Sequence, residues 1–379
     1  MFELTKEQEM LVKMVRDYAT NELEPRAEAV DKEGFIPQET YEEMGKIGLL
    51  GLNAPKEYGG AGMDDICKVL AIIEVARVCG STAEMFAVQL LVNYIIATNG
   101  NEEQKKKYLG MAKDGKIGAF ALTEPEAGSD AGSLQMTADK DGDDYILNGS
   151  KVFISNMGPN EGEWAIVFAL TDKAKGSHGG VTAFIVDRGT PGFTLGKLED
   201  KMGIRGAAVS ELIFEDCRVP SSQVLGGEGK GMHVAFSGLD SGRVGIAAQS
   251  IGYAQGALDL SVEYSKQRQQ FKKPISANQG LQWYMAEMAT RVDAAKLLAL
   301  RAASIMSGGN SATKEASMAK FFASETANWV AAKAVQIHGG YGFMRDYAVE
   351  RIYRDVRITT IYEGSSEVQK IVISRDLLK

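Results

Sequence analysis

The pattern of hydrophobic and polar positions divides the chain into two helical outer parts and a middle part of short strands. Near the N-terminus, Thr5 and Gln8 have the spacing of a capping box, and the apolar residues that follow recur at a helical period. Residues 67–78 and 83–98 are apolar nearly all round, which predicts helices buried between other helices. Residues 232–338 carry long apolar stripes at spacings of three and four, and residues 366–378 predict a final helix.

The middle part, from Phe120 to about Phe214, is rich in short β-type runs separated by Gly, Asp and Asn. Residues 145–147 and 151–155 flank Asn148-Gly149, a pair typical of a two-residue turn, so we predict a hairpin there. No helical pattern alternates with these strands. We therefore expect a small antiparallel barrel or sandwich rather than a parallel nucleotide-binding sheet.

Together these patterns predict a multidomain α+β protein. The expected parts are an N-terminal all-α domain (1–119), a middle β-domain (120–230) and a C-terminal four-helix-bundle domain (231–379). Long helices with few interruptions favour a bundle, which is a common site of association between subunits.

Composition narrows the classes of protein. The chain has 379 residues, of which 45% are apolar and 24% charged, and this balance excludes disordered and fibrous proteins. Its net charge of −8 argues against a nucleic-acid partner. No apolar run is long enough to cross a membrane, and Met1–Leu4 leads directly into a helical pattern rather than a signal peptide. We therefore expect a cytoplasmic protein.

The cysteines and histidines indicate no metal site. Three cysteines are scattered without C-x-x-C spacing, and three histidines lack ligand spacing, so zinc, a disulfide framework and a Ser-His-Asp triad are all disfavoured. The glycine-rich residues 226–231 superficially resemble a phosphate loop. They lack the Ser or Thr after Lys230 and the surrounding strand-helix context, so we interpret them as a domain junction.

The stretch with the most distinctive chemistry is residues 359–369. Glu363 is followed by Gly364, by Ser365 and Ser366, and then by a helical pattern. This order predicts a carboxylate at a helix N-terminus, where unpaired N–H groups gather. The carboxylate could be an ordinary acid of a helix start or a general base beside donors that polarise a carbonyl.

Three other stretches are individually unremarkable. Residues 122–130 read as a polar turn, residues 268–274 as a basic end of a helix, and residues 336–342 as a glycine-terminated helix. An arginine followed by an aromatic residue, as at Arg268 and Phe271, also suits a phosphate and a planar ring.

Taken together, these motifs resemble the acyl-CoA dehydrogenase family, in the same order and along essentially the whole chain. The similarity extends to the short-chain branch, which includes butyryl-CoA dehydrogenases of bacteria. The motifs are Thr123-Glu124-Pro125, Gly128-Ser129-Asp130, Asn148-Gly149-Ser150-Lys151, Ile154-Ser155-Asn156, Met202-Gly203-Ile204-Arg205-Gly206, Arg268 with Phe271, Gln336 with Gly339-Gly340-Tyr341-Gly342, and Tyr362-Glu363-Gly364-Ser365-Ser366-Glu367.

The resemblance implies that the protein binds FAD without a covalent bond. It assigns one set of FAD contacts to the β-domain, a second set that reaches FAD across a subunit interface, and a third set on the C-terminal helix. The first set is Phe120, Leu122, Thr123, Gly128, Ser129, Phe153, Ile154 and Ser155. The second set is Arg268, Phe271, Gln279, Gln336, Ile337, Gly339 and Gly340, and the third is Ser365, Ser366 and Glu367.

The resemblance also implies the reaction. Glu363 would remove the α-proton of an acyl-CoA while the β-hydride passes to flavin N5, which gives a trans-2-enoyl-CoA. The substrate would be held by Ser129, Asp240, Ser241, Gly242, Arg243 and Gly364. Some family members place the base on the segment that matches residues 240–243. Here Gly242 supplies no rival carboxylate.

The implied partners are a short-chain acyl-CoA, an electron-transfer flavoprotein and other copies of the chain in a homotetramer, a dimer of dimers. One alternative is the same site working in reverse as an anaerobic enoyl-CoA reductase on crotonyl-CoA or an aryl-acrylyl-CoA such as caffeyl-CoA. Another is a non-catalytic acyl-CoA-binding or assembly protein.

Three positions depart from the family pattern. Lys272 stands where glycine is usual, and Ala207-Ala208-Val209 replaces a stretch that usually carries Ser and Thr. In the segment expected to line the acyl pocket, the residues are unusual for a butyryl pocket. They are Met85, Phe86, Gln89 and Leu90.

Overall fold

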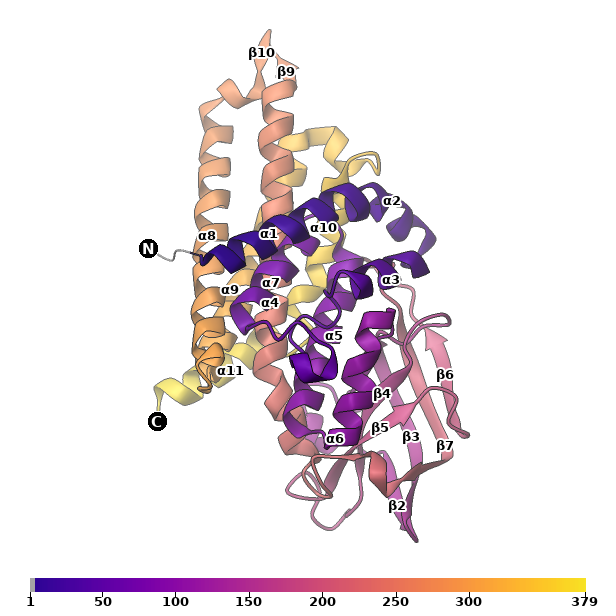
Figure 1. The fold of residues 1–379 in the computed structure, drawn as a ribbon. Coiled ribbons are helices and arrows are strands. Elements are labelled where there is room, and N and C mark those ends of the chain that lie inside the picture. The colour runs from indigo at the N-terminus through magenta and orange to yellow at the C-terminus, as the bar shows by residue number, and fades with distance from the viewer. Residues whose placement is uncertain (1–3) are drawn as a thin grey trace.

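The computed structural model describes residues 4–379. The sequence predicts that Met1–Leu4 leads directly into the first helix, and the first three of these residues lie outside the described range. Figure 1 shows three parts, which are a layer of N-terminal helices, a β-sheet, and long helices that run past both. This is the three-domain fold that the sequence predicts. No helix within residues 4–379 combines the length and apolar character that crossing a membrane requires.

The N-terminal part consists of helices, as predicted. Thr5 and Gln8 form the expected capping box at the start of α1. Asp64 caps α4 by accepting a hydrogen bond from the Cys67 N–H. The helices are α1 (Lys6–Tyr18), α2 (Glu24–Glu33), α3 (Gln38–Lys46), α4 (Asp65–Ala76), α5 (Gly80–Asn99) and the short α6 (Glu102–Gln104).

The middle part is an eight-stranded, mainly antiparallel sheet, with β1 and β2 pairing β4 in parallel. The order β6-β7-β3-β2-β4-β5-β8 forms one path, and β1 joins it at β4. The strands are β1 (Gly118–Ala121), β2 (Thr137–Asp141), β3 (Asp144–Ser155), β4 (Trp164–Leu170), β5 (Val181–Asp187), β6 (Phe193–Leu198), β7 (Val209–Pro220) and β8 (Val224–Leu225).

The predicted hairpin at Asn148-Gly149 is wrong, because β3 runs without a turn from Asp144 to Ser155. The pair instead makes a bulge against β7, between Leu147 and Gly149. Gly149 has φ +139°, and a Cβ there would lie 2.9 Å from the Met136 side chain. Gly149 therefore uses its freedom to adopt positive φ inside a strand, and the hairpin turn falls at Gly142, between β2 and β3.

The C-terminal part is built on α7, which is 37 residues long. Its first residue, Gly231, packs against the β5 backbone, and its last turn leads to the small β9–β10 hairpin at the far end of the long helices (Figure 1). The remaining elements are β9 (Gln269–Gln270), β10 (Lys273–Pro274), α8 (Gln279–Ser307), α9 (Thr313–His338), α10 (Ala348–Asp355) and α11 (Ser366–Leu377).

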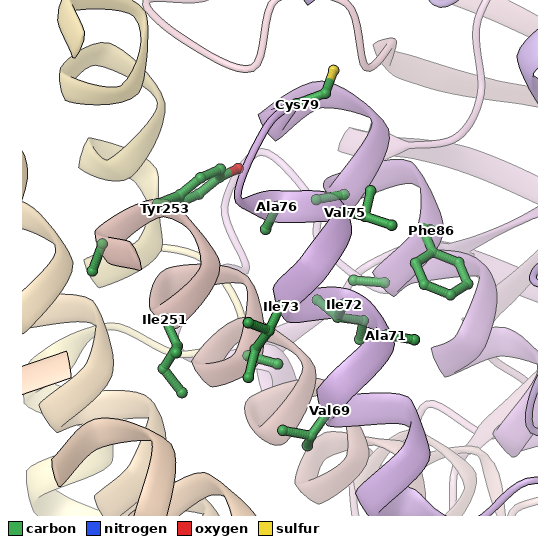
Figure 2. Close-up of a cluster of buried hydrophobic side chains, with 14 of the residues drawn as sticks. Val69, Ala71, Ile72, Ile73, Val75, Ala76, Cys79, Phe86, Ile251 and Tyr253 are labelled. Carbon is green, nitrogen blue, oxygen red and sulfur yellow. The ribbon is translucent and has the colours of Figure 1, made fainter. Parts of the chain in front are cut away.

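The largest hydrophobic core joins the N-terminal helices to the bundle. Figure 2 shows the side chains of α4 between Phe86 of α5 and Ile251 and Tyr253 of α7. Glycines allow close packing there, since a Cβ at Gly252 would lie 2.5 Å from the Ile73 carbonyl oxygen. This contact fixes α5 and α7 relative to each other, and the candidate site lies between these two helices.

Candidate functional site

Glu363 lies in a backbone conformation that few residues other than glycine adopt. Its φ is +52°, and Gly364 follows with φ +90°. Two residues later, Ser365 caps α11 by accepting a hydrogen bond from the Val368 N–H, as the sequence predicts. A strained, non-glycine residue beside a helix start is a feature typical of functional sites.

Two side chains hold this turn in place. Gln369 is fully buried, and its Nε2 donates to the carbonyl oxygens of Glu363 at 3.1 Å and Gly364 at 2.9 Å. Lys320 of α9 is also fully buried, and its Nζ donates to the Gly364 carbonyl at 2.7 Å. The strained turn is thus anchored by hydrogen bonds from two elements.

The Glu363 carboxylate faces α7 at Gly242. A Cβ built on Gly242 would lie 2.6 Å from Glu363 Oε2. Oε2 is buried and has no hydrogen-bond partner among residues 4–379. The two positions that could supply a base therefore meet in one place, and the missing side chain at Gly242 leaves room for the Glu363 carboxylate.

Burial raises the pKa of Glu363, while the positive charges of Arg243 and Lys320 act to lower it. Lys320 shows the opposite effect, because desolvation lowers its pKa to about 8 despite the attraction of Glu363. The site thus combines a poorly hydrated carboxylate with two nearby cations. This balance leaves the pKa of the carboxyl above its ordinary value while keeping cations near its ionised form, as suits a general base.

A second buried acid, which the sequence did not predict, lies beside Glu363. Glu84 of α5 is 2% exposed, and its Oε1 accepts a hydrogen bond from Ser155 Oγ at 3.1 Å. Desolvation raises its pKa to about 7, and the charge of Glu363 adds to that effect. Next to it, Tyr362 donates to Gln249 Oε1 at 2.6 Å. The sequence did carry one signal for this acid, because Glu84 is the one charged residue within the largely apolar residues 80–99.

Two of the expected acyl-pocket residues, Phe86 and Gln89, make contacts elsewhere in the chain. Phe86 points into the α4 core (Figure 2), and Gln89 accepts from the Gly118 N–H at 2.8 Å. Met85 and Leu90 are also buried. The face of α5 that runs along the site instead carries the residues at positions 84, 88 and 91, because Leu91 lies 3.7 Å from the Cβ position of Gly242 and Val88 is only partly buried.

Residues 122–130 form a loop tied down by a buried ion pair. Lys151 Nζ lies 2.7 Å from Glu124 Oε1 and also donates to the Leu122 carbonyl at 3.2 Å. Glu124 accepts further hydrogen bonds from the N–H groups of Gln135 and Met136. Desolvation lowers the pKa of Lys151 to about 8, although Glu124 acts to raise it.

The β-domain set of predicted FAD residues is gathered at this loop and at the end of β3. Gly128 and Ser129 are exposed, and Phe153 is 67% exposed with φ +59°. Phe120 is partly buried against Phe168. The Ile154 side chain is buried in the sheet core, so its predicted contact with FAD would have to come from its backbone.

The second predicted set lies at the other end of the bundle, around a cavity of about 520 Å³. Arg268 lines it and stacks 5.2 Å from the Tyr341 ring, while Ile337 contributes apolar surface. Gly339 has φ +61°, and a Cβ on it or on Gly340 would meet only open space. Gln279 and Gln336 are exposed nearby, at the start of α8 and near the end of α9.

The β9–β10 turn explains why glycine is usual in the family where this chain has Lys272. Phe271 and Lys272 have φ +52° and +64°, so both central residues of this two-residue turn are left-handed. Glycine adopts this conformation without the steric cost that lysine has. Phe271 is 93% exposed at the tip of the turn.

Several residues that were predicted to contact substrate or FAD make hydrogen bonds or ion pairs within the chain. The Ser241 hydroxyl accepts from the buried Lys68 Nζ at 2.7 Å, and the Ser366 hydroxyl donates to Glu325 at 2.6 Å. Asp240 pairs with Arg243 at 3.0 Å. Glu367 is exposed in the first turn of α11.

Comparison with protein families identifies the chain. Models of the N-terminal, middle and C-terminal domains of acyl-CoA dehydrogenases match residues 5–116, 119–217 and 229–378. The chain belongs to the acyl-CoA dehydrogenase family. It is therefore an oxidoreductase of a family of flavoproteins that act on CH–CH bonds.

Similar proteins include both dehydrogenases and reductases. The chain is 50% identical to an acryloyl-CoA reductase (NADH) of Anaerotignum propionicum, over 100% of this chain and 96% of that protein. It is 48% identical to a subunit of the caffeyl-CoA reductase–Etf complex of Acetobacterium woodii, over 99% of both. The butyryl-CoA dehydrogenase structure from Megasphaera elsdenii aligns over 100% of both chains with a TM-score of 0.96 and 43% identity.

The buried ion pair predicts a non-additive effect on stability. Lys151→Met should lower the free energy of unfolding by about 3–5 kcal/mol, because it leaves the Glu124 carboxylate buried without its cation. Adding Glu124→Gln should recover much of that loss, since the amide oxygen still accepts from backbone N–H groups. Chemical denaturation followed by circular dichroism measures both. A double variant as unstable as the sum of the two single variants would contradict a coupled pair.

Proposed function

We propose that the protein is an FAD-dependent dehydrogenase that converts a short-chain acyl-CoA to a trans-2-enoyl-CoA, with Glu363 as the base. The observation that carries this proposal is the Glu363 carboxylate, whose Oε2 atom is buried, has no hydrogen-bond partner among residues 4–379, and faces the gap left by Gly242. A thioester α-proton is only weakly acidic. The base must therefore act beside groups that stabilise the negative charge formed on the carbonyl.

The backbone near Glu363 can supply such a group. The Glu363 N–H donates to no acceptor within residues 4–379, so it is free to bind the thioester carbonyl oxygen. Glu363 would then take the α-proton, and Arg243 and Lys320 would stabilise its ionised form beforehand. Bound FAD would supply the acceptor for the hydride from the β-carbon.

The residues present fit a flavin dinucleotide. The exposed Phe153 and the open backbone at Gly128 and Ser129 offer an apolar surface and room for close approach at the β-domain, next to Thr123. We assign the cavity beside Arg268 to the phosphate and adenine part, because a guanidinium and glycine-rich backbone favour phosphate.

One chain cannot bring both sets to a single FAD. Gly242 touches Glu363, and Arg268 caps the C-terminal end of the same helix. At 1.5 Å per helical residue, about 39 Å separates them. We infer that Arg268, Phe271, Gln279 and Gln336–Gly340 serve the site of another copy, which supports a dimer as the unit of the expected homotetramer.

The substrate contacts proposed from the sequence need one refinement. Arg243 is buried, its Nε has no hydrogen-bond partner among residues 4–379, and Gly364 adjoins Glu363, so we assign these two to the CoA thioester. Ser129 is exposed in the 122–130 loop, and we keep it as a proposed contact. The Ser241 hydroxyl is engaged by Lys68. We assign Ser241 the task of positioning that segment of α7.

A second candidate is the same reaction run toward reduction, with protonated Glu363 giving its proton to the α-carbon. The similarity to an acryloyl-CoA reductase and to a caffeyl-CoA reductase–Etf subunit favours it. We propose an electron-transfer flavoprotein as the redox partner in both directions. Rates of enoyl-CoA reduction with reduced partner, compared with rates of acyl-CoA oxidation, distinguish the two.

Glu363→Gln should abolish the bleaching of flavin absorbance by saturated acyl-CoA under anaerobic conditions. General bases contribute about 100- to 10,000-fold to rate, and Gln keeps the size of the side chain, so FAD should remain bound. Stopped-flow absorbance measures this. Glu57→Gln, at an exposed acid in the short N-terminal 3-10 helix Lys56–Tyr58, serves as the control. Bleaching at the normal rate in Glu363→Gln would exclude Glu363 as the base.

Arg243→Gln should shift the pH dependence of flavin reduction. Arg243 lowers the pKa of Glu363, so its removal raises that pKa and moves the acid limb of the rate profile to higher pH. Arg243→Lys keeps the charge and should leave the limb close to that of the native protein. A limb that moves to lower pH, or equally in both variants, would contradict this electrostatic role.

A further inference from the structure

Glu84 places a hydrogen-bonding group where an acyl pocket would be expected to be apolar. Its side chain is 2% exposed, and Oε2 has no hydrogen-bond partner among residues 4–379. The other oxygen, Oε1, accepts from Ser155 Oγ at 3.1 Å. The Tyr362 hydroxyl and the Gln249 amide lie near enough to the carboxyl to act to lower its pKa, but in the described residues Tyr362 donates to Gln249 and Gln249 donates to Tyr253. A buried, unpartnered carboxyl oxygen is costly for the fold unless a ligand supplies the missing partner.

Glu84 lies on the face of α5 that leads toward Glu363, where the substrate would react. On α5, residues 84, 88 and 91 follow helical spacing and share one face. Leu91 on that face lies 3.7 Å from the Cβ position of Gly242, which itself touches Glu363. Val88 between them is partly exposed, although most of α5 is buried. This face therefore leads from Glu84, past the partly exposed Val88, to the residue that packs beside Gly242.

The surroundings of Glu84 keep its carboxyl in place. Tyr362, the neighbour of Glu363, donates to Gln249 at 2.6 Å, and Gln249 donates to Tyr253 at 2.7 Å. Tyr253 in turn donates to the Gly80 carbonyl, one helical turn before Glu84. This chain of hydrogen bonds fixes the Tyr362 and Gln249 side chains beside Glu84, and Ser155 at the end of β3 binds the carboxyl itself.

We propose that Glu84 determines acyl specificity, and that it selects a short acyl group with a neutral hydrogen-bonding end, such as a hydroxyl, over an apolar chain of the same length. This inference rests on the proposed function of the site. An apolar chain reaching Glu84 would leave the free oxygen buried without a partner, whereas a hydroxyl would satisfy it. Sites built around a buried polar group discriminate strongly against ligands that lack its partner.

The test compares two thioesters with the same number of heavy atoms in the acyl group, 4-hydroxybutanoyl-CoA and pentanoyl-CoA. Binding is measured by titration calorimetry in the Glu363→Gln holoenzyme, so that neither thioester is consumed. We expect 4-hydroxybutanoyl-CoA to bind at least about tenfold more tightly. Glu84→Leu in that background should reverse or abolish the preference, and Glu84→Gln, which retains a polar end, should keep it.

A preference that is the same in Glu84→Leu and its parent, tighter binding of pentanoyl-CoA by the parent, or failure to bind 4-hydroxybutanoyl-CoA would each overturn the proposal. The native holoenzyme separates this failure from that of the proposed function. If saturated acyl-CoA thioesters still bleach its flavin, the function stands and only the role of Glu84 is wrong. If no thioester of the panel bleaches it, the proposed function itself fails.

Discussion

The site depends on keeping one carboxylate, with its Oε2 atom buried, in a strained turn that is itself half-buried. Glu363 has a left-handed backbone, and an oxygen of its side chain lacks a partner within the described chain, so both features cost stability. Gln369 and Lys320 offset this cost by binding the turn's carbonyl oxygens, and Gly242 provides the space. The rest of the fold keeps this arrangement in position, because the core shared by α4, α5 and α7 fixes the helices that surround it.

The length of α7 imposes the second constraint. The helix starts against the sheet, passes Glu363 at Gly242, and ends at Arg268 beside a separate cavity. A helix is too stiff to fold the two ends together, so residues that the family resemblance assigns to one cofactor are held far apart in one chain. Association of subunits thus becomes a requirement of the proposed site. This requirement follows from the length of one continuous helix, α7, rather than from the surface of the bundle.

The sequence was informative where local rules decide structure. The capping box at Thr5, the apolar helices and the Ser365 cap are local features, and the structure has all of them. It was misleading at Asn148-Gly149, because pairing with β7 outweighed the turn preference of two residues. The sequence also could not predict which face of α5 meets the site. The helix is apolar nearly all round, so periodicity could not separate Glu84 from its neighbours. The proposed domain boundaries and ligand contacts remain predictions.

The central claim is that Glu363 removes the α-proton, and exchange of that proton with solvent tests it most directly. A thioester with sulfur in place of the β-carbon can lose an α-proton but has no β-hydride to give. In deuterium oxide, NMR should show deuterium entering its α-position in the native holoenzyme and not in Glu363→Gln. Exchange that continues at the native rate without the Glu363 carboxylate would contradict the account.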